Sequence, residues 1–118
     1  MSAKIKKQEF DLFNKLSEEW WDENGKFKVL HQIRPIRIEF ILDQLAQNNM
    51  KNPNILDLGC GGGLISESMS RLGCKVTGID FVKKNIEVAK LHAKKKKLNI
   101  NYIHADIEKY ITNKKYDV

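Results

Sequence analysis

The chain has 118 residues, of which 42% are hydrophobic and 31% charged, the composition of one soluble globular domain rather than of a collagen, a disulfide mini-protein or a disordered chain. No apolar run approaches the ~18 residues of a membrane-spanning helix, and the N-terminus lacks an apolar secretory segment. The net charge of +6 is carried by Lys more than by Arg, and the 2 cysteines are too few for a disulfide framework; we therefore expect a cytoplasmic protein without a nucleic-acid partner.

The N-terminal part, residues 1–52, is predicted to be a helical segment. Apolar residues recur at helical spacing over residues 6–21, before an Asn-Gly turn signal. Residues 26–34 have no clear period and predict an ordered loop. Pro35 is then expected to open a second helix, since its missing N–H does no harm at a first helical position.

Strands and helices are predicted to alternate from residue 54 onward. Strands are expected over 54–58, 75–80 and 99–104, with a fourth beginning at 116–118, and helices over 64–72 and 82–97 with a helical turn at 106–110. This order implies parallel strands joined by right-handed crossovers. The predicted fold class is α/β and Rossmann-like, truncated after the third strand, with residues 53–118 as an incomplete ligand-binding half-domain.

A glycine-rich turn follows the first predicted strand, in Ile55-Leu56-Asp57-Leu58-Gly59-Cys60-Gly61-Gly62-Gly63. Glycine allows a strand to turn directly into a helix and lets a ligand lie against the main chain. The free N–H groups at the start of the next helix favour a polar or anionic group. The turn is therefore the candidate ligand site.

The spacing of the glycines separates two classes of ligand. A dinucleotide site uses G-x-G-x-x-G, but Leu64 stands at the sixth position counted from Gly59. The spacing found is D-x-G-x-G-x-G, from Asp57 through Gly59 and Gly61 to Gly63. It resembles the first motif of class I S-adenosylmethionine-dependent methyltransferases, and the acid at the strand end suits a cationic methionyl group better than a phosphate.

Two further carboxylates end the next two strands. Asp80 follows Gly59 by 21 residues, the position of the acid that accepts two hydrogen bonds from a ribose diol. Asp106 follows the third strand, where methyltransferases usually meet the adenine amino group. All three carboxylates fall at the carboxyl ends of parallel strands, where open α/β sheets bind ligands.

Structural explanations stand beside these functional ones. Asp57 is also explained as a turn carboxylate, and Asp80 and Asp106 as N-caps of the segments that follow them. Cys60 is interpreted as a small loop filler, and His92 as a surface residue on the Lys-rich helix.

The wider pattern resembles the ubiquinone-biosynthesis O-methyltransferase family. The similar segments are Trp20-Trp21-Asp22, Gly25-Lys26-Phe27-Lys28, Leu30-His31, Ile33-x-Pro35-x-Arg37, the glycine turn, Glu67-Ser68-Met69, Val76-Thr77-Gly78-Ile79-Asp80 and Val88-Ala89-Lys90-Leu91-His92-Ala93. The block from Trp20 to Arg37 is the most discriminating, because generic methyltransferases lack it.

The resemblance implies methyl transfer from S-adenosylmethionine to hydroxyls of polyprenylated catechol and demethylubiquinol rings. It places Arg37 at the cofactor carboxylate, Gly59 under the methionine and Asp80 at the ribose; Asp106 is less secure, because the family varies there. The tryptophan pair and His31 either pack the N-terminal helices or form a lid over the prenyl tail. The lipid-soluble tail implies peripheral contact with the inner face of a membrane.

The family continues beyond the point reached at Val118, through an acidic segment proposed for a divalent metal and for catalysis. We therefore expect a fragment or a truncated reading frame, with catalytic residues beyond Val118 and no metal site within the chain. A non-catalytic module that keeps the fold and binds S-adenosylmethionine is the alternative. A dinucleotide oxidoreductase is disfavoured by Leu64.

Overall fold

The computed structural model describes residues 3–110 and 114–118. Its elements follow in the order α1 (Ala3–Trp21), α2 (Lys28–Gln47), β1 (Asn54–Leu58), α3 (Leu64–Arg71), β2 (Lys75–Asp80), α4 (Lys83–Lys95) and β3 (Asn101–His104). The three strands form one parallel sheet in the order β1-β2-β3. This arrangement confirms the predicted α/β class.

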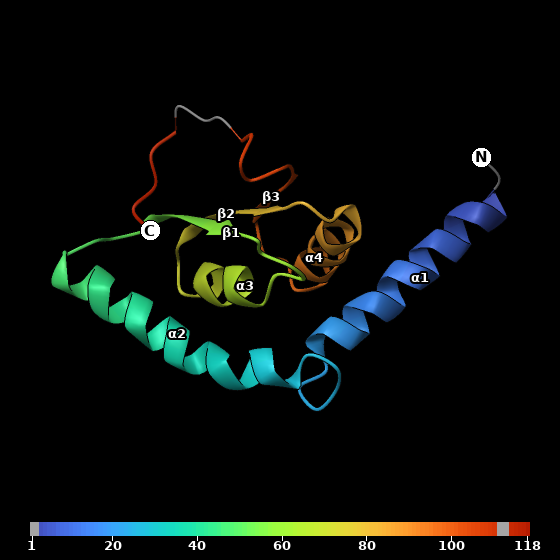
Figure 1. The fold of residues 1–118 in the computed structure, drawn as a ribbon, viewed down its shortest axis with the longest axis horizontal. Helices are drawn as coiled ribbons and strands as arrows, with labels where there is room; N and C mark the ends of the chain where they lie inside the picture. Colours follow the sequence, from blue (N-terminus) through green and yellow to red (C-terminus); the bar gives the residue numbers. More distant parts are fainter. Residues whose placement is uncertain (1–2, 111–113) are drawn as a thin grey trace.

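The helices form a second layer against the sheet. Figure 1 shows α3 and α4 together under one face of the sheet, with α2 running beside α3 and α1 extending away past α4. β2 lies in the middle of the described sheet, and all of its residues after Lys75 are buried, as expected for a parallel strand covered on its faces and edges. None of the helices among the described residues is both long and apolar enough to cross a bilayer.

The core divides into two clusters, one that includes α3 and one that includes α4. One joins α2, β1, α3 and β2 through Leu45, Ile55, Met69, Cys74 and Val76. The other joins the glycine turn, α4 and β3 through Cys60, Ile86, Ala89, Ala93 and Tyr102. Both cysteines are free and buried.

The last described residues lie on the free edge of β1. The Asp117 N–H donates to the Asn54 carbonyl (2.7 Å), and the Leu56 N–H donates to the Val118 carbonyl (2.9 Å). The segment has no strand assignment of its own. Its backbone bonds nevertheless lie where the predicted fourth strand would pair, on the side of β1 opposite β2.

The predicted loop over residues 26–34 is wrong from Lys28 onward, because α2 begins there and Pro35 lies inside the helix. An internal proline costs about 3 kcal/mol of helix stability. The first turns of α2 are held by tertiary contacts instead. The His31 side chain is buried, and its Nε2 lies 2.8 Å from the Trp20 carbonyl oxygen at the end of α1.

Candidate functional site

The site is built on the turn between β1 and α3. Gly59, Gly61 and Gly63 have φ values of +73°, +56° and +94°, in the left-handed region that glycine adopts without a steric penalty. The N–H groups of Gly59 and Cys60 both donate to the Ile79 carbonyl of β2, at 2.7 and 3.0 Å. The turn is therefore fixed to the neighbouring strand.

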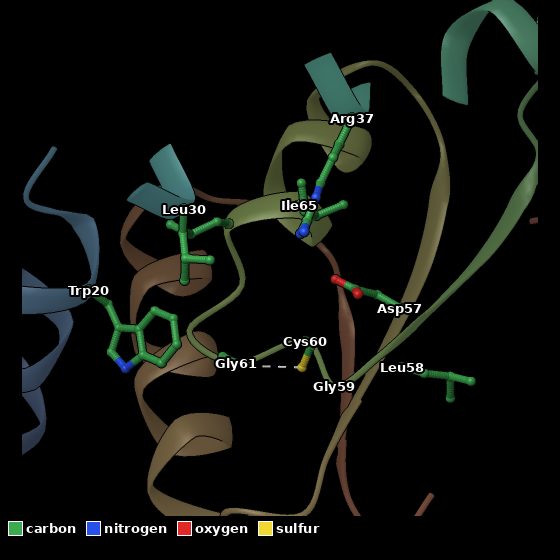
Figure 2. Close-up of a pocket in the computed structure, with 10 residues that line it drawn as sticks. Trp20, Leu30, Arg37, Asp57, Leu58, Gly59, Cys60, Gly61 and Ile65 are labelled. Atoms are coloured by element: carbon green, nitrogen blue, oxygen red, sulfur yellow. Dashed lines mark hydrogen bonds between the residues drawn. The ribbon is translucent and has the colours of Figure 1, made fainter. Parts of the chain in front are cut away.

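A cavity of about 200 Å³ opens over this turn. Figure 2 shows Arg37 reaching into it from α2, Asp57 from the end of β1 and Trp20 from α1 on the opposite side. The remaining lining residues are Leu30, Leu58, Gly59, Cys60, Gly61, Leu64 and Ile65. Four of the seven predicted site residues, Arg37, Asp57, Gly59 and Gly61, thus line one cavity.

The Asp57 carboxylate accepts a side-chain hydrogen bond at one of its two oxygens. The Ser66 hydroxyl of α3 donates to Asp57 Oδ2 at 2.6 Å. Burial raises the pKa of the Asp57 carboxyl above its ordinary value, reinforced by the nearby charge of Asp80 and opposed by the Ser66 hydrogen bond. With Arg37 on another wall, the cavity offers a cation and an acid to a ligand that carries both charges.

Asp80 lies directly behind the glycine turn. Its Oδ2 accepts a hydrogen bond from the Gly61 N–H at 2.9 Å, and its Oδ1 accepts one from the Val82 N–H at 2.8 Å. The residue is only 9% exposed and does not line the cavity. In this structure Asp80 ties the turn to the start of α4. The Asn85 side-chain amide also donates to Oδ1, at 3.4 Å, so Oδ2 is the oxygen that keeps a lone pair for another donor.

Asp106 is not brought to the cavity. Its Oδ1 accepts from the Glu108 N–H at 3.0 Å, and its carbonyl accepts from the Lys109 N–H at 3.0 Å. It therefore heads a turn over residues 107–109, the capping role weighed from the sequence. Gly63 also stands back from the cavity, under the hydroxyl of Tyr102.

Trp20 belongs to the site, although no spacing rule singled it out. An ideal Cβ on Gly62 would lie 2.5 Å from Trp20 Cδ2, and one on Gly61 would lie 2.7 Å from Trp20 Cη2. The indole ring therefore rests on the turn, and Gly62 provides the room for it. The sequence contained a signal in the Trp-Trp pair, but it could not tell which ring faced the ligand.

His92 is not the surface residue predicted. Its Nδ1 lies 2.5 Å from Oε2 of Glu67, whose side chain is fully buried, and its ring stacks on Trp21 at 3.8 Å. Arg71 Nη2 also contacts Glu67, at 3.2 Å. These contacts join α1, α3 and α4, and they fix the end of α1 beside the turn.

Among the described residues, no side chain at the cavity is an activated nucleophile, and none belongs to a cluster that could hold a metal ion. Burial, together with the charges of Asp57 and Asp80, raises the pKa of the Cys60 thiol, so Cys60 fills space as expected rather than reacting as a thiolate. Residues 3–110 and 114–118 hold no group of three or more His, Cys, Asp or Glu side chains arranged for a metal ion.

Curated relatives share the sequence over nearly the whole chain. A ubiquinone biosynthesis O-methyltransferase from Pelagibacter ubique (strain HTCC1062) is 52% identical over 122 residues, covering 97% of this chain and 51% of that protein. One from Rickettsia prowazekii (strain Madrid E) is 44% identical over 118 residues, covering 98% of this chain and 47% of that protein. The chain spans about half the length of these relatives.

Solved structures share the fold, and a family model matches the α/β part. The plantazolicin methyltransferase BpumL in complex with a triazolic desmethylPZN analog and SAH is 26% identical, with a TM-score of 0.61 over 96% of this chain and 47% of that one. An S-adenosylmethionine-dependent methyltransferase from Clostridium acetobutylicum ATCC 824 has a TM-score of 0.62 over 92% of this chain and 41% of that one, at 19% identity. The family described as "Methyltransferase domain" matches residues 55–118, and the chain belongs to that family.

Proposed function

We propose that the protein containing this chain is an S-adenosylmethionine-dependent O-methyltransferase of ubiquinone biosynthesis, acting on hydroxyls of polyprenylated phenols or quinols. The observation that carries the proposal is the similarity to the named relatives, 52% identity over 97% of the chain in one case. It runs through both the Trp20–Arg37 block and the glycine turn, so it includes the residues that line the cavity. The division into a helical segment, residues 1–52, and a cofactor-binding unit, residues 53–118, is part of this proposal.

The cavity residues fit the charged end of the cofactor. The Arg37 guanidinium suits the carboxylate and Asp57 the ammonium, while the left-handed Gly59 and Gly61 let the methionine chain lie against the backbone. Asp80 is the acceptor for the ribose diol beyond the turn. Asp106 remains the weakest member of the set, since its carboxylate already caps a turn.

The cofactor supplies a methyl group on a sulfonium, which an acceptor oxygen attacks. This chain binds and orients the cofactor: Arg37 and Asp57 hold its carboxylate and its ammonium, and the buried turn keeps water from one side of it. The proposal assigns no residue of this chain as the base that removes the acceptor proton.

Calorimetric titration with S-adenosylhomocysteine tests the binding role. Arg37→Ala is expected to weaken binding about 10–100-fold, because it removes a charge-assisted contact worth ~1.5–3 kcal/mol. Arg34→Ala is the matched control, since Arg34 lies one turn earlier on α2 and does not line the cavity. Equal affinity in the two variants would remove Arg37 from the site.

Turnover separates the enzyme from a non-catalytic binding module. A protein that carries this chain is incubated with labelled S-adenosylmethionine and a prenylated catechol. Label in the extracted acceptor supports the enzyme; tight binding of S-adenosylhomocysteine without label favours the module. Competition by NADH against S-adenosylhomocysteine would instead favour a dinucleotide site.

We also infer that the protein works in the cytoplasm, in peripheral contact with a membrane surface. The chain carries a net charge of +6, and α2 exposes a stripe of large apolar side chains, Val29 (66% exposed), Ile36 (71%) and Phe40 (65%). Apolar side chains and basic charge together favour an anionic lipid surface. Sedimentation with anionic vesicles is expected to drop for Ile36→Ser/Phe40→Ser but not for Leu72→Ser, a leucine that is 54% exposed just after the end of α3. Equal sedimentation of both variants would contradict the contact.

A further inference from the structure

Trp20 lies directly against the glycine turn of the proposed cofactor site. The indole rests on Gly61 and Gly62, with less room between the ring and either Cα than an added Cβ would need. Its other face is covered by Phe27, whose ring stacks on it at 3.8 Å with an interplanar angle of 8°. The ring is therefore held between the glycine turn and an aromatic side chain.

The indole also separates two cavities. On one side lies the cavity with Arg37, Asp57 and Gly59, of about 200 Å³. On the other lies a second cavity of about 200 Å³, lined by Phe27 and by Val82 and Asn85 at the start of α4. Trp20 lines both. Pockets for small ligands and cofactors measure about 300–1,000 Å³, so each cavity alone is too small.

Two charged groups predicted to hold the ligand line the first cavity, and a third, Asp80, lines neither cavity but is bonded to residues of the second. Arg37 and Asp57 line the first. The second lies beside Asp80, because Asn85 Nδ2 is 3.4 Å from Asp80 Oδ1 and the Val82 N–H donates to the same oxygen. A ligand that extends from the first cavity into the second passes Trp20, because the indole lines both cavities and rests on Gly61 and Gly62.

We propose that Trp20 is the gate of the cofactor site: its indole lies across the cleft as in this structure, and it swings off the glycine turn when S-adenosylmethionine binds, joining the two cavities into one. This inference rests on the proposed function, because it takes the adenosyl ligand from there. The free energy of the Trp20–Phe27 stack and of the indole contact with the turn opposes binding, so only the open fraction of the protein binds ligand.

The contacts around Trp20 favour a side-chain swing over release of the whole helix. The Trp20 carbonyl oxygen is 2.8 Å from His31 Nε2. The next residue, Trp21, stacks on His92, which is bonded to the buried Glu67. The backbone at the end of α1 is thus fixed on both sides. The indole itself is only partly buried, so its side chain can rotate while the backbone stays in place.

Calorimetric titration of the chain with S-adenosylhomocysteine tests the gate. Trp20→Ala removes the closing group and is expected to bind about tenfold more tightly than the unchanged chain, because a closed state no longer competes with the ligand. Phe13→Ala is the matched control: Phe13 is another aromatic of α1 but lies against α4, away from the turn. Its affinity is expected to stay within about twofold.

The opposite result has a clear meaning. If Trp20→Ala binds more weakly or equally, the indole is a fixed wall of the site and the gate is wrong, while the proposed function stands. If neither the chain nor Trp20→Ala binds S-adenosylhomocysteine, both proposals fail for this chain. Binding by Trp20→Ala alone supports both.

Fluorescence gives a second readout that keeps Trp20 in place. The chain has 2 tryptophans, so Trp21→Phe leaves Trp20 as the only emitter and Trp20→Phe leaves Trp21. On addition of S-adenosylhomocysteine, Trp20 emission is expected to shift and its quenching by acrylamide to rise, while Trp21 emission stays constant. Ligand binding by calorimetry with no change in Trp20 quenching would overturn the gate.

Discussion

Replacing Asp80 with Ala tests how the glycine turn and the ligand site depend on one carboxylate. Asp80 accepts hydrogen bonds from the N–H groups of Gly61, at 2.9 Å, and Val82, at 2.8 Å. Val82 is exposed, so water replaces its lost partner, but Gly61 is buried and its N–H is left without one. The net cost is therefore close to one hydrogen bond to a charged group, about 1.5–3 kcal/mol.

Two measurements follow from this single change. The melting temperature is expected to fall by roughly 10 °C, since a loss of 1 kcal/mol in stability lowers it by about 4–8 °C for a small domain. Affinity for S-adenosylhomocysteine is expected to fall 10–100-fold, because the diol loses its acceptor and the turn loses its support.

Asp106→Ala is the matched control for Asp80. Asp106 also follows a strand and accepts a backbone hydrogen bond, but its partner Glu108 is exposed. The variant is expected to change stability by no more than ~0.5 kcal/mol and to weaken affinity for S-adenosylhomocysteine less than Asp80→Ala does. If Asp106→Ala weakened binding and Asp80→Ala did not, the assignment of the two carboxylates would have to be exchanged.

Three further predictions come from buried groups. Asp57→Asn is expected to unfold at a higher temperature than the unchanged chain at pH 7, because the raised pKa of Asp57 means that ionisation of its carboxyl destabilises the folded state as pH rises above 3.8. The difference in melting temperature should vanish below pH 3.8, where the carboxyl is protonated in both states. The affinity of the variant for S-adenosylhomocysteine should fall. His92→Phe keeps a ring to stack on Trp21 but removes a partner of the buried Glu67, so chemical denaturation should show that the free energy of unfolding falls by about 2 kcal/mol. Adding Glu67→Leu to the same chain should recover much of this loss. No recovery would contradict the pairing. Iodoacetamide should label Cys60 and Cys74 slowly in the folded chain at pH 8 and quickly in urea, because burial raises the pKa of both thiols.

Much of the α/β unit could be predicted from the sequence because its patterns are local. β1 and β2 begin and end where the apolar runs do, and the glycine spacing placed the turn between β1 and α3. β3 begins at Asn101, two residues later than predicted. Arg37 could not have been placed from spacing alone; the family resemblance assigned it to the cofactor, and the structure puts it at the cavity with Asp57.

The errors arose where distant contacts decide the structure. α2 carries apolar side chains on opposite sides, Leu45 in the core and Ile36 at the surface, so its first turns show no helical period. His92 stands among lysines, and its partner Glu67 is 25 residues away. The Trp-Trp pair was expected to serve as a lid or as packing; the structure gives Trp20 to the glycine turn and Trp21 to His92.

The segment on the edge of β1 yields the last prediction. Asn54 is bonded to Asp117 twice: its N–H donates to Asp117 Oδ2 at 2.7 Å and its carbonyl accepts from the Asp117 N–H at 2.7 Å. Leu56 N–H donates to the Val118 carbonyl at 2.9 Å. These bonds occupy donors and acceptors that an edge strand otherwise presents to other chains.

Asp117→Ala removes only the side-chain bond, whereas deletion of residues 116–118 also removes the backbone bonds to Asn54 and Leu56. With a net value of about 0.5–1.5 kcal/mol for each bond, the substitution is expected to lower stability by ~1 kcal/mol and the deletion by ~2–4 kcal/mol. The deletion should also increase light scattering with protein concentration, because β1 then exposes its edge next to the apolar side chain of Leu58, which is already half exposed. Asp11→Ala, on the exposed face of α1, controls for the loss of an acidic charge. Equal melting temperatures for the deletion and the unchanged chain would show that the contacts at Asn54 and Leu56 do not protect the sheet.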